Sequence, residues 1–214
     1  MQKKLIYALS SFLLVGAIVT GLYRFDIFNS VVVENFDDLT DWSCLQGTCA
    51  TVNGNARLGS TDHSTLLYNM ETTENFEIIA KYKINSGYGS RRINFSFRSG
   101  GEKLGVRNFS TYSVSVSGDL ETPDTITLDR WDANGIYARL ASLKDDGVIK
   151  PGVYGYIKII VLGEDIKIKS SSDGYRWVNE ISYTDPYPMV GRKLMIYSTD
   201  YSTIDIDFVK IKSL

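Results

Sequence analysis

The sequence has few of the residue types from which metal sites and hydrolase sites are built. Its 214 residues include two cysteines, one histidine and four prolines. A structural zinc site takes four Cys or His ligands, which one cysteine pair and His63 do not supply. A Ser-His-Asp triad would have to use His63, which lies in the polar string Thr61-Asp62-His63-Ser64. We expect this histidine to be solvated in a loop rather than catalytic.

Excess positive charge is missing as well. The net charge is −2, and residues 1–24 carry three basic groups, Lys3, Lys4 and Arg24, with no acid. The rest of the chain therefore carries 20 basic groups against 25 acidic ones, a net charge of −5. A nucleic-acid partner needs a basic surface that faces the phosphates, so we expect no nucleic-acid partner.

Long apolar runs are absent except near the N-terminus, where residues 5–23 contain no charged side chain. As a helix rising about 1.5 Å per residue, this run is just long enough to cross a hydrocarbon core about 30 Å thick. Residues 1–24 are therefore a signal anchor or a signal peptide cleaved after Gly21, with residues 25–30 as a short linker. Val19 occupies a position where a cleavage site takes a small residue, so we favour the anchor. In both interpretations the remainder is extracytoplasmic, either anchored to the membrane or secreted.

The two cysteines, Cys44 and Cys49, stand close together in the sequence. Outside the cytoplasm the oxidising environment favours a disulfide, here one that closes a short loop. Two free thiols are the alternative, since the backbone must still bring the two Cα atoms within reach of each other.

Alternation of apolar and polar side chains dominates from residue 31 onward, as in Ile93-Asn94-Phe95-Ser96-Phe97-Arg98. This period of two predicts strands with one buried and one solvated face. Such strands are predicted at residues 76–84, 93–98, 112–117, 153–161, 166–169, 194–197 and 204–211. Turn-forming pairs such as Asn53-Gly54 separate the strands, and only residues 131–143 are compatible with a short helical turn. We therefore predict one all-β domain over residues 31–214, a two-sheet antiparallel sandwich.

Six short motifs follow one another along this domain. They are the opening string at 34–42, the Asn-Phe-Glu-Ile strand at 75–78, the Phe-Arg pair at 97–98, the hairpin around Gly163 at 156–168, the Ser-Ser-Asp-Gly-Tyr-Arg-Trp string at 171–177 and the closing strand at 206–211. In this order they resemble the concanavalin A-like jelly-roll superfamily, in particular its lectin/glucanase-like and laminin-G-like members. The resemblance implies a jelly-roll sandwich over residues 31–214. It implies no single activity, because this fold carries lectins, glycosidases and adhesion modules.

Carboxylates in the arrangement of a glycosidase are not found. Glucanases of the superfamily carry a Glu-x-Asp-x-x-Glu string on one strand, which this sequence lacks, and glycosidases in general place two carboxylates about 5–10 Å apart. Asp205 and Asp207 share a strand face, and we expect them to be solvated. The alternative is a structural calcium site completed by an acid from residues 34–41. We therefore assign no catalytic residue and expect no cofactor other than that calcium ion.

A polar row is predicted on one sheet face. The alternation places Asn94, Ser96 and Arg98 on the solvated face of their strand, next to a serine row at positions 113, 115 and 117. Side chains of these types donate and accept hydrogen bonds and so suit the hydroxyl groups of a sugar. Asn94 and Arg98 are therefore candidate ligand-binding residues.

Aromatic side chains in loops supply the other half of a sugar site. Tyr88, Trp131 and Tyr175 are the candidates for stacking against a ligand, whereas Trp42 and Trp177 are expected in the core. The sequence thus predicts an extracytoplasmic carbohydrate-binding or adhesion module whose partners are the membrane and a glycan or surface protein. A glycoside hydrolase-related enzyme and a structural cell-surface or assembly protein are the alternatives.

Overall fold

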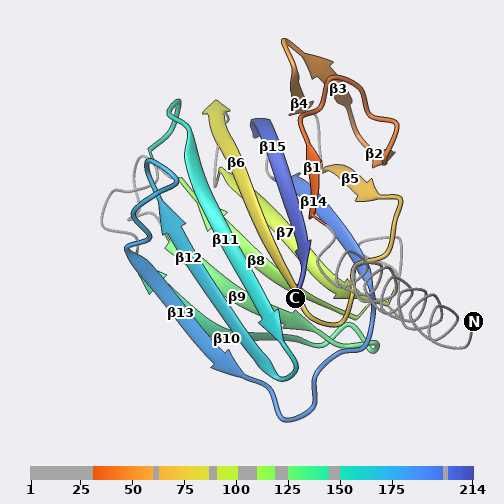
Figure 1. Cartoon of the computed structure of the whole chain (residues 1–214), viewed down its shortest axis with the longest axis vertical. Coiled ribbons are helices and arrows are strands. Elements are labelled where there is room, and N and C mark those ends of the chain that lie inside the picture. The colour runs from red at the N-terminus through yellow and green to blue at the C-terminus, as the bar shows by residue number, and fades with distance from the viewer. Residues whose placement is uncertain are drawn as a thin grey trace, which may run out of the picture.

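The computed structural model describes residues 31–59, 63–86, 91–100, 110–118, 125–144, 150–199 and 202–214. The predicted anchor at residues 1–24 and the linker at 25–30 lie outside the described residues. The regular secondary structure of the described ranges consists of strands, arranged as two antiparallel sheets packed face to face (Figure 1). The predicted all-β sandwich is therefore confirmed. Among the described residues no helix has both the length and the apolar character needed to cross a membrane.

The first layer is an 8-stranded sheet. Its order is β13 (Asn179–Thr184), β12 (Asp165–Ser171), β11 (Gly155–Leu162), β6 (Phe76–Ser86), β15 (Thr203–Ser213), β4 (Asn55–Leu58) and β3 (Cys49–Val52), and β1 (Val31–Glu34) also pairs with β15. Strand β1 runs antiparallel to β15, so that Val31 pairs with Lys212 and Glu34 with Val209.

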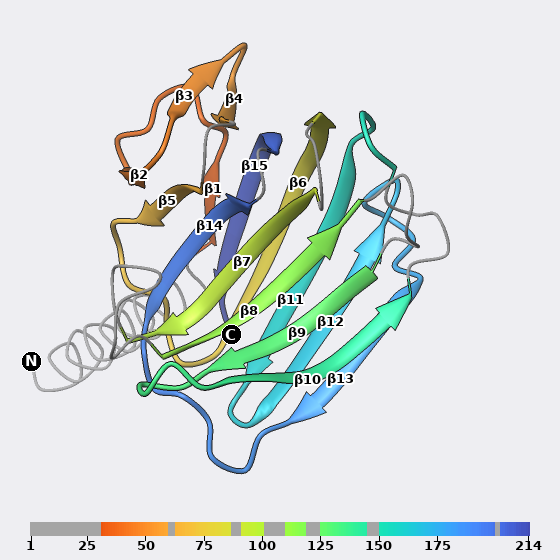
Figure 2. The ribbon, with the colours of Figure 1, turned by 180° about the vertical axis from the view of Figure 1, so that it is seen from behind.

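The second layer is a 7-stranded sheet, which faces the viewer in Figure 2. Its order is β10 (Tyr137–Lys144), β9 (Thr125–Trp131), β8 (Thr111–Ser117), β7 (Arg92–Ser99), β14 (Lys193–Thr199), β5 (Ser64–Tyr68) and β2 (Trp42–Gln46). Strands β7 to β10 are neighbours in both sequence and space, which is the up-and-down order that short antiparallel connections favour.

The core lies between the layers and is formed by alternate residues of the facing strands. Phe76 and Tyr82 of β6 meet Phe97 and Phe95 of β7, with ring centroids 6.0 Å apart in both pairs and edge-to-face geometry. All four side chains are buried. Burial of rings of this size is the main stabilising contribution in a sandwich core, and the period-two pattern of the sequence identifies these positions.

The turns that join β3 to β4 and β9 to β10 each contain an Asn-Gly pair. Asn53 and Gly54 join β3 to β4 with φ of 53° and 75°, the left-handed pair that a tight hairpin requires. Gly135, with φ of 76°, lies in the turn between β9 and β10 in the same way. The helical turn considered for residues 131–143 is therefore wrong, because β9 ends at Trp131, β10 begins at Tyr137 and Asn134-Gly135 lies in the turn between them.

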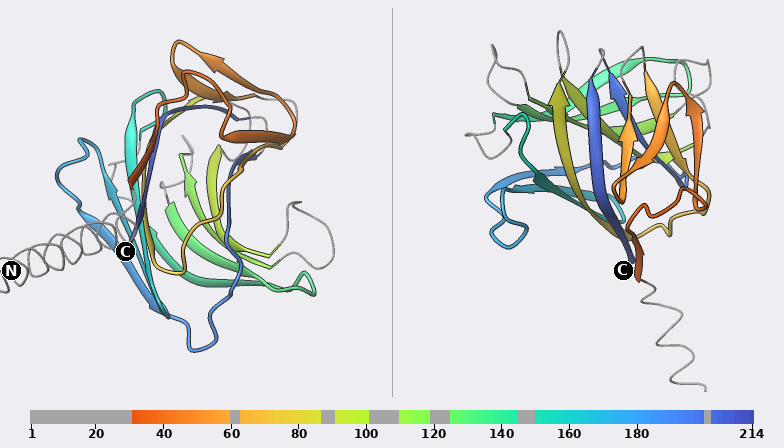
Figure 3. Two further views of the ribbon diagram at one scale, coloured as in Figure 1. Left: turned by 45° about the vertical axis from the view of Figure 1, so that its right-hand side comes forward. Right: turned by 90° about the horizontal axis from the view of Figure 1, so that it is seen from above.

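The disulfide predicted between Cys44 and Cys49 is present, with a Cα–Cα distance of 5.8 Å. Cys44 belongs to β2 and Cys49 to β3, the edge strands of the two different sheets. The bond therefore joins the two layers at one margin of the sandwich, where strands β1 to β4 gather in Figure 3, while β10 and β13 are the edge strands of the opposite margin.

Candidate functional site

The outward face of the 7-stranded sheet is hollowed by a groove of about 390 Å³. Its walls are side chains that alternate with core residues along five neighbouring strands. The lining residues are His63, Arg92, Asn94, Ser113, Ser115, Asp129, Trp131, Tyr137, Arg139, Tyr197 and Thr199. Because successive side chains of a strand point to opposite faces, the pattern that buries Phe95 and Leu128 also directs Asn94 and Asp129 into the groove.

A carboxylate, that of Asp129 on β9, organises one side of the groove. Its Oδ1 accepts hydrogen bonds from the Tyr137 hydroxyl at 2.8 Å and from Arg139 Nε at 3.0 Å, and its Oδ2 accepts one from Thr127 Oγ1 at 2.9 Å. Asp129 itself is buried. Three donors therefore fix the carboxylate and, through it, the two β10 side chains that reach the groove.

Two aromatic rings stand together at the end of this network. Trp131 of β9 and Tyr137 of β10 have ring centroids 5.0 Å apart and planes inclined at 56°, and they are 37% and 43% exposed. Burial and the hydrogen bond to Asp129 raise the pKa of Tyr137, so its hydroxyl stays protonated at neutral pH. The pair offers apolar ring surface beside fixed polar groups, which is the combination that binds the faces and hydroxyls of a sugar.

Unpartnered polar atoms face the same space. Asn94, which is only 3% exposed, accepts a hydrogen bond from Ser115 Oγ on its Oδ1, but its Nδ2 has no partner. Thr199 Oγ1 on β14 is likewise buried without a partner. A buried donor without a partner carries a desolvation cost that a bound ligand can remove.

Of the five predicted ligand-binding residues, the structure brings two together in the groove, Asn94 and Trp131. Tyr175 is 88% exposed at the turn after β12, in the other sheet. Arg98 lines a different cavity, and Tyr88 lies outside the described residues. Asp129 was considered only as an acid of the glycosidase alternative and was not predicted to bind a ligand, although it stands two residues before Trp131 on the same strand face and could have been found from that spacing.

Two placements differ from the prediction. The polar row is buried rather than solvated, since Asn94, Ser96 and Ser113 are almost fully covered although they point away from the core. Arg98 leaves the row because its φ is 49° and the β7–β14 register shifts beside it. Such a bulge places two residues of one strand opposite one of its neighbour and redirects a side chain.

Of the two tryptophans expected in the core, one is there and the other is not. Trp42 is buried in the core as expected, packed between the tilted rings of Phe36 and Tyr68 with centroids 5.6 and 5.1 Å away. Trp177 is half-buried outside the core, and Lys158 Nζ lies 4.4 Å from its ring centroid. Its expected place in the core is therefore wrong.

The two acids of the last strand are both paired with basic side chains. Asp205 is buried, with Arg57 Nε at 2.6 Å and Lys83 Nζ at 3.4 Å, and Asp207 lies 2.7 Å from Lys81 Nζ. The expectation that Asp205 is solvated is wrong for this reason. Within the described ranges no group of three His, Cys, Asp or Glu side chains is arranged to hold a metal ion.

The two sheet orders and the face-to-face packing define a class of fold, the two-sheet antiparallel β-sandwich. No family model matches the sequence, and no curated protein sequence matches it. Solved structures do match. The exoplasmic/lumenal domain of VIP36 in its Ca²⁺/Man3GlcNAc-bound form is 13% identical with a TM-score of 0.66, covering 85% of this chain and 88% of that domain.

Two bacterial structures are similar as well. The carbohydrate-binding module CBM66 from Bacillus subtilis is 20% identical with a TM-score of 0.59, covering 79% of this chain and 94% of the module. The GH43 protein BlXynB from Bacillus licheniformis is 12% identical with a TM-score of 0.60, and the match covers 85% of this chain but 39% of that protein. At these identities the likeness shows the shared fold.

Proposed function

We propose that this chain is an extracytoplasmic, membrane-anchored carbohydrate-binding module that binds a glycan in the groove of the 7-stranded sheet and performs no catalysis. The observation that carries the proposal is the Trp131–Tyr137 ring pair beside buried polar atoms, two of which lack partners. Ring surface and hydrogen-bonding groups within one hollow are what recognition of a sugar requires.

Each part of the groove has a role in this proposal. A sugar ring packs against Trp131 and Tyr137, its hydroxyls donate to Asp129 and accept from Asn94 Nδ2, and Arg139 donates from the rim. Asp129 is held by its three donors before any ligand arrives, so little side-chain order is lost on binding. A sugar hydroxyl that accepts from Asn94 also relieves the cost of that unpartnered donor.

Similar structures support the glycan as ligand. VIP36 has the same fold in a form bound to Man3GlcNAc, and CBM66 is by its name a carbohydrate-binding module. The absence of catalysis is supported by the groove itself, in which Asp129 is the one carboxylate among the lining residues that the structure describes. Glycosidases use two across the scissile bond.

The extracytoplasmic location is supported by the apolar run at residues 5–23 behind Lys3-Lys4 and by the disulfide. A disulfide persists in an oxidising compartment. Addition of a protease to intact cells tests the location: the domain is digested from outside while a cytoplasmic marker survives. Survival of the domain in intact cells and its loss only after lysis would contradict the location.

A glycan array probed with the purified full-length chain tests the ligand. We expect a defined set of glycans to be bound, and Trp131→Ala to lower the affinity for them by at least tenfold, a loss of about 1.4 kcal/mol. Tyr175→Ala removes a more exposed aromatic ring from the turn after β12, in the other layer, and is expected to bind as the wild type does. Binding that survives Trp131→Ala, or binding to no glycan, would contradict the proposal.

The same array separates the further alternatives. Cleavage of a bound glycan that Asp129→Asn abolishes would indicate an enzyme instead of a binding module. VIP36 is known in Ca²⁺-bound and metal-free forms, so the array is run with calcium and with EDTA. Loss of binding in EDTA alone would identify a calcium requirement.

A further inference from the structure

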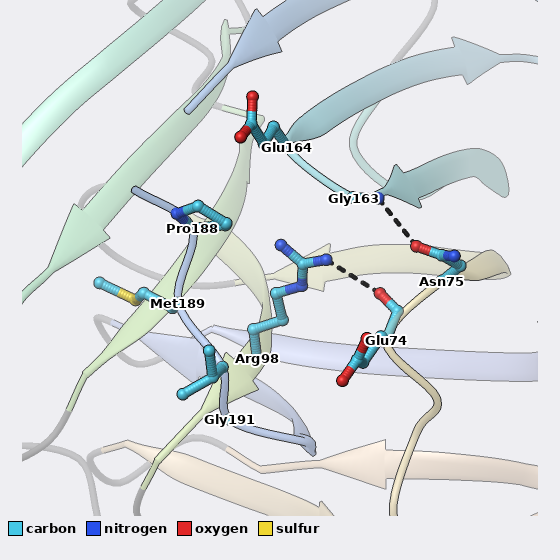
Figure 4. A pocket seen from close by; sticks show the side chains of 9 residues that line it. Glu74, Asn75, Arg98, Gly163, Glu164, Pro188, Met189 and Gly191 are labelled. Carbon is cyan, nitrogen blue, oxygen red and sulfur yellow. Dashed lines mark hydrogen bonds between the residues drawn. The ribbon is translucent and has the colours of Figure 1, made fainter. Parts of the chain in front are cut away.

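A second cavity, of about 200 Å³, lies at the end of the sandwich where β7 finishes. It is separate from the groove and is bordered by the β11–β12 hairpin and by the segment between β13 and β14 (Figure 4). Its lining residues are Glu74, Asn75, Arg98, Gly163, Glu164, Pro188, Met189, Val190 and Gly191. The cavity is about the size of one small molecule, below the range of about 300–1,000 Å³ usual for larger ligands.

The guanidinium of Arg98 lines this cavity, and one of its two terminal nitrogens has no hydrogen-bond partner. The bulge in β7 turns the side chain away from the sheet face, and the residue is only 5% exposed. Nη2 donates to the Glu74 carbonyl at 2.9 Å, whereas Nη1 is buried without a partner. In Figure 4 the free end of the guanidinium points to the space between Pro188 and Glu164.

Arg98 also has no carboxylate in direct contact, although Glu74 and Asp185 lie near enough to attract its charge. Among the described residues no carboxylate lies within the 4.0 Å of an ion pair with it, and Glu74 pairs instead with Arg192 at 3.8 Å. Because the side chain is buried, water solvates its charge poorly, and this burial lowers the pKa of Arg98. A buried cation that is neither paired nor fully hydrogen-bonded is costly, so an anion that reached Nη1 would gain a strong interaction.

The walls of the cavity are held in place without a ligand. Gly191 passes so close to β7 that a Cβ there would lie 2.2 Å from the Ser99 carbonyl carbon. Asp185 fixes the start of the same segment, accepting hydrogen bonds from Arg130 at 2.6 Å and from the Tyr187 amide at 2.9 Å. The Asn75 side chain holds the opposite wall by accepting from the Gly163 amide at 2.8 Å.

We propose that this cavity is a second binding site, which binds a small ligand that carries a carboxylate group. A carboxylate oxygen accepts from Arg98 Nη1, and the apolar surfaces of Pro188, Met189 and Val190 cover the rest of the ligand. The guanidinium fork is the protein group best matched to a carboxylate. The site is independent of the groove and goes beyond the proposed function, because it stands on Arg98 alone and not on Trp131.

The carboxylate can belong to a simple organic acid or to an acidic sugar, and three probes distinguish these sources. Saturation-transfer difference NMR is recorded with the purified full-length chain and acetate, glucuronate or glucose. Glucuronate and glucose share the ring and differ in the carboxylate. We expect signals from glucuronate that exceed those of glucose at least threefold. Competition by acetate would show that a simple carboxylate suffices, and no competition would show that the sugar ring is needed as well.

Variants then locate the signal. Arg98→Met removes the cation and is expected to reduce the glucuronate signal to the level of glucose. Arg98 also donates to the Glu74 carbonyl, so Arg98→Met can destabilise the fold. A second variant leaves Arg98 in place. Val190 is 91% exposed, and Val190→Asp places a competing carboxylate at the rim of the cavity. Val190→Asp is expected to lose the glucuronate signal, while the matched Val190→Ser keeps it.

The groove variant Trp131→Ala separates this inference from the proposed function, since it is expected to keep the glucuronate signal. A glucuronate signal equal to that of glucose, or one that Trp131→Ala removes and Val190→Asp leaves intact, would overturn the second site. The first result leaves glycan binding in the groove untouched, whereas the second would place the glucuronate in the groove and not in this cavity.

Discussion

Tyr137 of β10 lies opposite Trp131 and reaches diagonally to Asp129 of β9, where the tyrosine hydroxyl donates a 2.8 Å hydrogen bond to the carboxylate. The same carboxylate receives Arg139 and Thr127, so three side chains depend on one buried group. This dependence ties the stability of the β9–β10 pair to the shape of the groove.

Asp129→Asn is expected to lower both the stability of the fold and the affinity of the groove for its ligand. The amide has one oxygen to accept hydrogen bonds and introduces an NH2 group that faces donors, so we expect the free energy of unfolding to fall by about 1–3 kcal/mol. Ligand affinity is expected to fall at least tenfold. Urea unfolding and calorimetric titration measure the two effects. Asp165→Asn, the same change at an exposed residue that accepts from Thr184, is expected to alter stability by about 0.5 kcal/mol or less.

Asp205 predicts how stability depends on pH. Burial raises the pKa of its carboxyl, but the hydrogen bonds from Arg57 and Asn85 and the positive charges of Arg57 and Lys83 together outweigh burial, so the pKa is lowered overall. The stabilisation is therefore complete above the unfolded value of about 3.9 and is lost as the pH falls below it through the folded pKa. We expect Asp205→Asn to cost about 2 kcal/mol at pH 7 and the difference from wild type to shrink at pH 3, measured by urea unfolding.

Asp207 is the matched control for that experiment because it lies two residues away on the same strand. It pairs with Lys81 while more than a third of its side chain is exposed, so we expect Asp207→Asn to cost less than about 1 kcal/mol. Equal losses for both variants at pH 7 would contradict the special role of burial at Asp205.

The disulfide is expected to stabilise the fold although its loop is short. For a loop of this length, restriction of the unfolded chain contributes roughly 2 kcal/mol. The double variant Cys44→Ser, Cys49→Ser should therefore unfold at lower urea concentration than wild type. Wild type in reductant should unfold at the same urea concentration as the double variant. A midpoint that changes neither in the variant nor in reductant would show that noncovalent contacts alone stabilise the margin formed by β2 and β3.

Gly191→Ala tests the close contact that forms one wall of the second cavity. A Cβ at 2.2 Å from the Ser99 backbone requires the segment to move, and we expect a loss of about 1–3 kcal/mol in unfolding free energy. Gly155→Ala is the control, because its nearest contact would be 3.6 Å from the Tyr82 hydroxyl. Thermal unfolding of both variants measures the contrast.

The period of two predicted the strands β6, β7, β8, β11, β12, β14 and β15, whose inward faces are buried, but not β1 to β5, β9, β10 and β13. The positions of Phe76, Phe95 and Val114 follow directly from it. Strand β10 was missed because its residues are largely exposed and do not alternate, so its pairing with β9 rather than its own pattern sets its structure. The Asn134-Gly135 pair was the available signal, since this pair is typical of a hairpin.

The site was harder to predict than the fold. Asn94 and Trp131 could be named because a polar row and an aromatic ring are visible in sequence. Arg98 could not be placed, since a single left-handed residue and a shift of register move it from the sheet face to the end of the sandwich. The neighbours of Asp129 depend on which strands pair, and a single sequence does not contain that information.

The pairing of Val31 with Lys212 has a mechanical consequence. A load applied at residue 31 enters the domain through β1 and its pairing with β15, and so falls first on the 8-stranded sheet, whereas the groove lies on the other layer. If the proposed anchor holds the chain at that end, the point of attachment and the proposed binding surface therefore belong to different layers of the sandwich.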